Sequence, residues 1–183
     1  MKVRNSTRYK LLLFLFIGSL LAGCKRNGVI NGENYTLTAV DNSRNLYLQS
    51  RKFSGVIFAH HSTDFNKKKT RRFTPSAKEI FKAEQIFQNY LRLNKAGEDG
   101  IKVNSSLIQA PFNYYRQYLG YYNEQGQKTI FFNCLLKRSA GSEWKRSELA
   151  FRDGENNCFS ILVNIHRQSC SSFTLNGGNK VIN

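Results

Sequence analysis

The chain has 183 residues, and its 28 Lys and Arg against 12 Asp and Glu give a formal net charge of +16. That length accommodates one domain with a hydrophobic core plus short additional segments. So basic a surface disfavours cationic partners and favours anionic ones, such as lipid head groups, lipopolysaccharide phosphates or an acidic protein.

The first residues have the pattern of a secretory signal peptide. Four basic residues and no acidic one precede an apolar run over residues 11–21. A positive segment followed by a short apolar one is typical of secretion. The run is too short for a membrane-spanning helix, which needs about 20 apolar residues. The small residues Ala22 and Gly23 follow, so we expect removal of residues 1–23.

The signal ends in Leu21-Ala22-Gly23-Cys24, which resembles the bacterial lipobox. The resemblance implies cleavage before Cys24 and lipidation of its thiol, and several acyl chains anchor a protein stably. The alternative is an ordinary signal peptide with a chance cysteine at the cut. Lys25 follows in place of the Asp typical of inner-membrane retention, and no acidic run suggests surface export. The resemblance therefore implies an outer-membrane anchor with the domain facing the periplasm.

The predicted mature chain keeps a net charge of +12, because the signal removes four basic residues and no acidic one. Nucleic acid suits such a charge, but an envelope protein rarely meets it, so we expect no nucleic-acid partner. The periplasm permits disulfides. Beyond Cys24, the remaining cysteines predict one disulfide and one free thiol, with the pairing left open; they are Cys134, Cys158 and Cys170.

Residues 24–50 are rich in Asn, Ser and Gly, and we interpret them as the lipidated cysteine and a tether that ends in a short strand near residues 46–48. The α+β domain is expected over residues 51–177, with a tail over 178–183. Its first strand starts at Phe53, in a stretch rich in β-branched and aromatic residues. A basic loop then carries the densest charge of the chain, formed by Lys67, Lys68, Lys69, Arg71 and Arg72.

Residues 74–97 predict a long amphipathic helix. Thr74 is the expected N-cap, Pro75 suits the first helical position and Gly97 suits the position after the helix. One apolar stripe recurs at three- and four-residue steps. It consists of Ala77, Ile80, Phe81, Ala83, Phe87, Tyr90 and Leu91.

Strands dominate the second half. Residues 114–123 and 128–137 predict a hairpin, and residues 147–153 predict a further strand. Residues 158–165 alternate between apolar and polar, as in a half-buried antiparallel strand. One helix followed by antiparallel strands predicts an α+β fold, a curved antiparallel sheet that wraps its apolar face around the helix and leaves the other face wet.

Residues 74–177 are similar to small secreted proteins of unknown function from Bacteroidota, which share an RQY-G hairpin, a D-G-x-x-C-aromatic strand and a closing N-G strand. The resemblance implies a cystatin-like or NTF2-like fold and brings no activity. The matching positions are Arg116, Tyr118, Gly120, Gly126, Asp153, Gly154, Cys158, Phe159, Asn176 and Gly177.

Catalytic and metal chemistry find little support in the sequence. Adjacent residues of a strand point to opposite faces, so His60 and His61 are not expected to share a metal ion, with or without Asp64. Ser62 lacks the G-x-S-x-G elbow of a hydrolase. A thiol nucleophile activated by His166 is the weaker enzyme alternative. We therefore expect a non-enzyme without cofactor or metal.

Two surfaces are the candidate binding sites. In a strand, Tyr114, Tyr118 and Tyr122 share one face with Arg116, and that face is a candidate aromatic platform for a sugar or a partner side chain. The alternative is that the tyrosines simply cover the sheet. The basic loop is the second candidate, because each basic residue near an anionic membrane contributes about 1 kcal/mol; the alternative is a solvated loop.

These observations predict an outer-membrane-anchored periplasmic lipoprotein with a non-catalytic binding domain for an anionic glycolipid or a protein partner. The alternative is an inhibitor or immunity-type factor that binds an acidic enzyme. The cystatin-like resemblance suggests it, although the Q-x-V-x-G loop of cystatin protease inhibitors is absent from the sequence.

Overall fold

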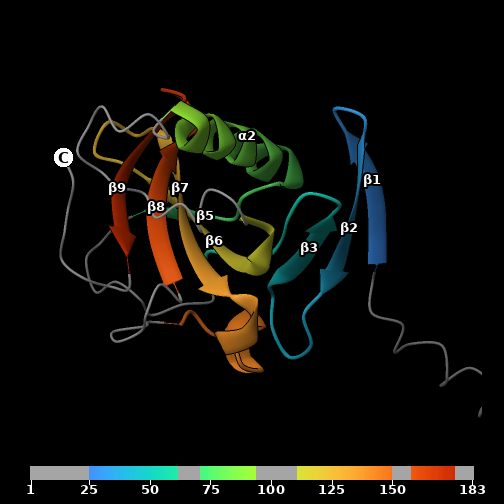
Figure 1. Ribbon diagram of the computed structural model, residues 1–183. Coiled ribbons are helices and arrows are strands. Elements are labelled where there is room, and N and C mark those ends of the chain that lie inside the picture. The colour runs from blue at the N-terminus through green and yellow to red at the C-terminus, as the bar shows by residue number, and fades with distance from the viewer. Residues whose placement is uncertain (1–24, 62–70, 94–110, 150–157, 176–183) are drawn as a thin grey trace, which may run out of the picture.

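In the computed structural model, residues 25–61, 71–93, 111–149 and 158–175 are described. They form one helix packed against a large, mostly antiparallel and open sheet (Figure 1). The predicted α+β class is therefore confirmed.

The sheet has nine strands in the order β1-β2-β3-β4-β6-β7-β8-β9, and β5 pairs with β6 beside this path. All neighbours pair antiparallel except β4 and β6, which are parallel. The strands are β1 (Lys25–Ile30), β2 (Glu33–Ala39), β3 (Leu46–Ser50), β4 (Ser54–Ile57), β5 (Arg72–Phe73), β6 (Tyr114–Tyr122), β7 (Lys128–Leu136), β8 (Cys158–Asn164) and β9 (Ser169–Leu175). The helix is α2 (Ala77–Leu93), and short 3-10 turns are η2 (Pro111–Asn113), η3 (Lys137–Ser139) and η4 (Glu143–Lys145).

The tether predicted over residues 24–50 is wrong where β1 and β2 of the sheet form, whereas the short strand predicted near residues 46–48 is confirmed as β3. Asn31 and Gly32 have φ of 51° and 74°, and two such residues make the tight turn that joins hairpin strands. Tyr35 of β2 packs its ring 5.5 Å from that of Phe81 on the helix. Turn chemistry and apolar alternation therefore place this segment in the fold. Cys24 lies outside the described residues.

The hairpin predicted in the second half is confirmed. β6 pairs with β7 from Tyr114 opposite Leu136 to Tyr122 opposite Lys128. Gly126 has a φ of 72° in the turn between them, a conformation that favours glycine. The strand predicted at residues 158–165 is confirmed as β8. The further strand predicted over residues 147–153 is wrong for residues 147–149, which do not form a strand. Residues 150–153 lie outside the described residues.

The helix is confirmed, with a different start. Ser76 and Glu79 form a capping box, since the Glu79 backbone N–H donates to Ser76 Oγ at 3.3 Å and the Ser76 N–H donates to Glu79 Oε2 at 2.8 Å. Ser76, rather than Thr74, is therefore the N-cap. The predicted end near Gly97 lies outside the described residues, which follow the helix to Leu93.

Both faces of the sheet are covered. The main core lies between α2 and the sheet, where Ile80 and Phe87 meet Phe132 in fully buried positions. The opposite face holds a second cluster, in which Trp144 packs with Leu119. We call residues 137–149 the cover segment. Because this segment packs there, the prediction of a wet second face is wrong over β6 and β7.

Buried amides attach the cover segment to the sheet. Gln117 donates to the carbonyl oxygens of Trp144 and Ser147 at 2.7 and 2.8 Å. Asn133 donates to Gln117 Oε1 at 2.7 Å and to the Leu149 carbonyl oxygen at 2.7 Å. Buried polar groups need such partners, so these amides fix the position of the segment.

Across the residues that the structure describes, no helix has both the length and the apolar character needed to cross a membrane.

Candidate functional site

The predicted aromatic platform is wrong as an exposed surface. Tyr114, Arg116 and Tyr118 are 5%, 1% and 0% exposed, and Tyr122 is half-buried. Tyr114 and Tyr118 belong to the core cluster beneath α2. Their shared face was predicted correctly, but it is the face that the helix covers.

Arg116 instead forms a buried ion pair. Its Nε lies 2.6 Å from Oε1 of Glu84 on the helix, and the Tyr118 hydroxyl donates to the same oxygen at 2.8 Å. Gly55 on the neighbouring strand makes room for the pair, because a Cβ there would lie 2.5 Å from the Arg116 carbonyl oxygen and the Tyr118 ring. The cluster therefore links α2 to the middle of the sheet.

Burial controls the protonation of this cluster. Desolvation raises the pKa of Glu84, against the opposing effect of the Arg116 charge. Desolvation and the neighbouring Glu84 raise the pKa of Tyr118 well above its usual value. Burial lowers the pKa of Arg116, but Glu84 outweighs it and the net direction is upward. Tyr118 is thus a neutral donor at physiological pH, and Arg116 stays charged.

The predicted basic loop is described only at its end. Lys67, Lys68 and Lys69 lie outside the described residues. Arg71 lies 4.1 Å from the centre of the Tyr122 ring, and Arg72 of β5 lies 5.2 Å from that of Tyr121.

The predicted disulfide is absent, since Cys134, Cys158 and Cys170 are all free thiols. Cys134 belongs to the cluster under the helix and Cys158 to the cluster on the opposite face. Cys134 pairs with Phe159, whereas Cys170 pairs with Val163. Four residues of strand span about 13 Å, and a disulfide needs Cα atoms within about 7 Å. Cys134 and Cys158 are therefore kept apart because they point to opposite faces of the sheet. Cys134 and Cys170 are kept apart because the register places them four residues from each other along β8.

The histidine pair is arranged differently from the expectation. His60 and His61 lie in a turn after β4, and their ring centres are 3.4 Å apart. The argument from strand alternation therefore fails for them. His166 lies in the turn between β8 and β9. Over the described part of the chain, no group of three or more His, Cys, Asp or Glu could hold a metal ion.

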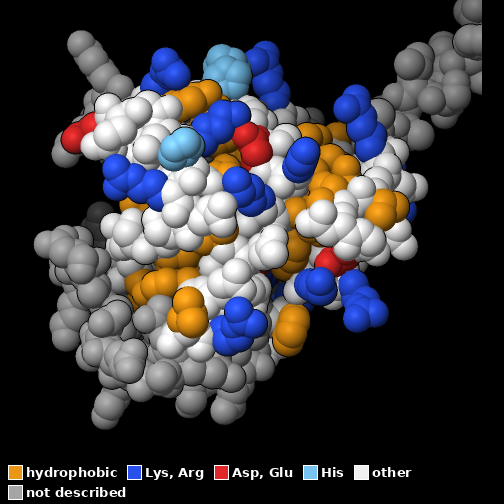
Figure 2. Space-filling view, turned by 90° about the horizontal axis from the view of Figure 1, so that it is seen from above, with side chains coloured by type: hydrophobic (Ala, Val, Ile, Leu, Met, Phe, Trp, Pro, Cys, Tyr) orange, Lys and Arg blue, Asp and Glu red, His pale blue; other side chains and the backbone are white. Residues whose placement is uncertain are grey.

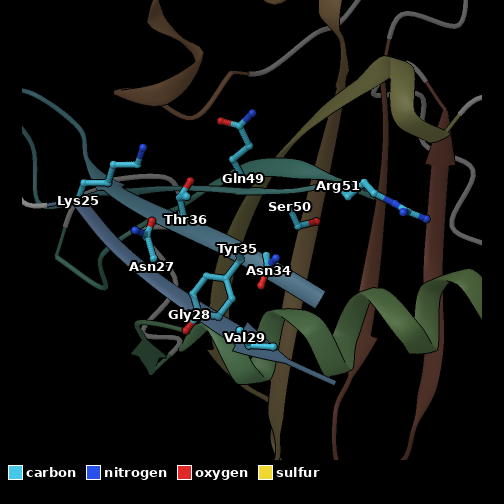
Figure 3. Close-up of a pocket in the computed structure, with 10 residues that line it drawn as sticks. All are labelled: Lys25, Asn27, Gly28, Val29, Asn34, Tyr35, Thr36, Gln49, Ser50 and Arg51. Carbon is cyan, nitrogen blue, oxygen red and sulfur yellow. The ribbon is translucent and has the colours of Figure 1, made fainter. Parts of the chain in front are cut away.

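A polar groove lies on the face of β1–β3 that points away from α2. Cross-strand partners Asn27, Thr36 and Gln49 form a row across the three strands. Figure 3 shows Lys25, Thr36 and Gln49 on this side, while the Tyr35 ring points toward the helix side. The first part of the groove has a volume of about 790 Å³ and includes Lys25, the row, and Arg51.

The groove continues toward the cover segment. Its second part, about 570 Å³, shares Lys25, Thr36 and Gln49 with the first and is closed by Lys145 and Arg146. Asn45 fixes this wall, because its side-chain amide donates to the carbonyl oxygens of both residues at 3.1 and 3.4 Å. We call both parts together the basic groove.

The charge of the basic groove is unbalanced. Lys25, Arg51, Lys145 and Arg146 line it, against Asp41 as the acidic side chain among the lining residues. The Arg146 guanidinium also pairs with exposed Glu143 at 3.3 Å. The Lys145 ammonium lies 4.1 Å from the centre of the Tyr47 ring, and a cation–π contact of this kind orients the charge. A row of neutral donors flanked by cations is suited to bind an anion with several oxygens.

Basic side chains are not confined to this groove. Figure 2 shows Lys and Arg distributed over the face that carries α2, with few acidic side chains between them. What distinguishes the basic groove is therefore its hollow shape and its row of neutral donors, rather than positive charge alone.

The sequence prediction missed the basic groove. Lys25 lies in the segment predicted as a tether and Arg51 directly follows it, so the sequence pattern assigns neither residue to a binding site. The Asn31-Gly32 turn, followed by the alternation of Tyr35, Leu37 and Ala39, was the available signal for a hairpin here. Nothing in the sequence indicated that Lys145 and Arg146 would meet them.

Comparisons of the chain with family models, curated proteins and solved structures found no match.

Proposed function

We propose that this protein is an outer-membrane-anchored periplasmic lipoprotein whose non-catalytic domain binds a phosphate-bearing anionic glycolipid through the basic groove. The observation that carries the proposal is that the groove combines a hollow with a row of neutral donors, which four basic side chains and one acidic side chain surround. Such a site attracts phosphate by long-range electrostatics and holds it by charge-assisted hydrogen bonds.

The predicted anchor supports the same partner. β1 begins at Lys25, directly after Cys24. Lipidation of Cys24 would therefore hold its neighbour Lys25, one of the groove residues, close to the membrane surface. Basic residues close to an anionic surface contribute about 1 kcal/mol each, so the anchor and the groove favour the same surface.

We also propose a cystatin-like arrangement for the part of the fold formed by α2 and β6–β9. A single helix across an antiparallel sheet supports it. The strands β1–β3 extend the sheet beyond this part, and they carry one wall of the proposed site.

The experiment measures binding in detergent micelles, with the full chain purified from membranes. Diphosphorylated lipid A is titrated by calorimetry, with dephosphorylated lipid A as the comparison. The test variant replaces the four basic residues of the groove by Gln (Lys25, Arg51, Lys145 and Arg146). The control variant removes the same number of exposed charges elsewhere, at Lys78, Lys82, Arg92 and Arg167.

We expect the native chain and the control to prefer the diphosphorylated lipid, with an affinity that falls as salt rises. The groove variant should bind at least about tenfold more weakly, which corresponds to about 1.4 kcal/mol. Equal binding by the groove variant and the control contradicts the proposal. A stable complex with one acidic protein, without lipid A binding, would favour the inhibitor alternative. Labelled palmitate should enter the native chain and not Cys24→Ala.

A further inference from the structure

A second cleft lies on the opposite side of β1–β3, beneath α2. It has a volume of about 610 Å³, within the range of small-molecule sites. One stripe of the helix forms one wall, and the turns after β1 and β3 form the other. We call it the helix cleft; it is lined by Ile30, Asn31, Glu33, Arg51, Lys52, Phe53, Phe81, Glu84, Gln85, Gln88, Asn89 and Phe112.

Aromatic rings form the apolar part of the helix cleft. Phe53 and Phe81 pack edge to face with their centres 5.1 Å apart. Phe112 is 56% exposed, among the large apolar side chains that the described surface leaves open to solvent. An exposed ring at the mouth of a cleft offers a flat face to the C–H groups of a ligand.

The two carboxylates of the helix cleft are already paired with cations. Glu33 Oε2 lies 2.9 Å from the Lys52 ammonium, and Glu84 pairs with Arg116 at 2.6 Å. Arg51 adds a positive charge at the edge. A charged ligand would therefore find the counter-charges at the base already paired, and Arg51 lies at the edge, where water screens its charge. The cleft favours a neutral ligand.

Neutral hydrogen-bonding groups remain. The helix wall carries three exposed carboxamides on one side of α2. They belong to Gln85, Gln88 and Asn89. Glu84, itself 3% exposed, lines the cleft, and its Oε2 receives no hydrogen bond of acceptable geometry. The Gln88 side chain lies close enough to this carboxyl to favour its charged form. A buried acceptor without a full partner is costly, and a ligand hydroxyl would satisfy it.

We propose that the helix cleft binds a neutral sugar residue. A sugar ring combines an apolar C–H face, which suits Phe112, with hydroxyl groups that both donate to and accept from carboxamides. The hydroxyl nearest the base would donate to Glu84 Oε2, after Gln88 moves aside. This site does not depend on the basic groove, since the two cavities share only Arg51 among their lining residues.

The test is saturation-transfer NMR on the full chain in detergent micelles. The neutral probes are maltotriose, cellotriose and triacetylchitotriose. Glucosamine and glucuronic acid, each compared with glucose, test the preference for a neutral ring. Two single variants, Phe112→Ala and Gln85→Ala, remove one apolar and one polar contact at exposed positions, so the thermal midpoint should not change. Lys82→Ala, exposed on the same helix outside the cleft, is the matched control.

We expect at least one neutral probe to bind, glucose to bind more tightly than its charged analogues, and each cleft variant to lower the affinity about tenfold. The control should bind as the native chain does. The proposal is overturned if no neutral probe binds, if glucosamine binds as tightly as glucose, or if the two cleft variants match the control. A groove variant that keeps Arg51 and replaces only Lys25, Lys145 and Arg146 should still bind the sugar. This result distinguishes a wrong proposal for the helix cleft from a wrong proposal for the basic groove.

Discussion

The Nε atom of Arg116 lies 2.6 Å from Oε1 of Glu84, and the two side chains are 1% and 4% exposed. The pair joins the first half of β6 to the middle of α2. Removing two charges from water is costly, so such a pair adds little net stability over apolar residues of similar size. Losing one partner is a different matter, because the other charge then stays buried alone.

Glu84→Gln should therefore lower the free energy of unfolding by about 3–5 kcal/mol, measured by urea denaturation. The double variant Glu84→Leu with Arg116→Met removes both charges and should recover most of that loss. Glu79→Gln is the control, because its ion pair with Lys128 is partly exposed at 23% and 44% and should contribute at most about 1 kcal/mol. Equal effects of Glu84→Gln and Glu79→Gln would contradict this interpretation.

Local patterns predicted the elements with strong periodicity. The stripe that contains Ile80 and Phe87 identified α2, and the alternation of Phe159, Ile161 and Val163 identified β8. In the helix every third to fourth residue faces the core, and in the strand every second residue does. Each period can therefore be recognised from a short stretch of sequence.

The rest depended on contacts between distant segments. β1–β3 are short and largely polar, and their place in the sheet comes from pairing with β4 and packing on Phe81. Arg116 was expected at the surface because arginine is rarely buried, and only the position of Glu84 on the folded helix explains its burial. The second part of the basic groove likewise exists only because the cover segment brings Lys145 to the same sheet face as Lys25.

Gln117→Ala should detach the cover segment. Gln117 is fully buried, and it bonds to two carbonyl oxygens of that segment and to Asn133. The partners left unsatisfied should lower the free energy of unfolding by about 2–3 kcal/mol. Because Lys145 and Arg146 belong to the same segment, the affinity for diphosphorylated lipid A should fall as well. Gln85→Ala, at an exposed position of α2 outside the basic groove, should leave stability unchanged within about 0.5 kcal/mol. Loss of stability in Gln117→Ala without any loss of lipid binding would show that the groove does not depend on the segment.

Glu148 should make the stability depend on pH. Burial raises its pKa to about 7 from the usual 4.5, against the opposing effect of Arg72. A carboxyl group with a raised pKa holds its proton better in the folded state, so unfolding releases a proton between these two values. The free energy of unfolding should therefore fall, by up to about 3 kcal/mol, as pH rises from 4.5 to 7.

Glu148→Gln should remove this fall, so that denaturation curves between pH 4 and 8 show a flatter profile than those of the native chain. Glu143→Gln changes an exposed carboxyl on the same segment and is the control. A native profile that Glu148→Gln leaves unchanged would contradict the assignment.

The three cysteines should stay reduced and slow to react. Burial raises the pKa of Cys134 far above its usual range and that of Cys170 to about 12, and the thiolate is the species that alkylating agents attack. Iodoacetamide at pH 8 should therefore modify the native protein slowly. After unfolding without reductant, mass spectrometry should find Cys134, Cys158 and Cys170 all labelled. Two unlabelled cysteines that become reactive only after reduction would reveal a disulfide, and would require a shift in the pairing of β7, β8 and β9 that separates these thiols.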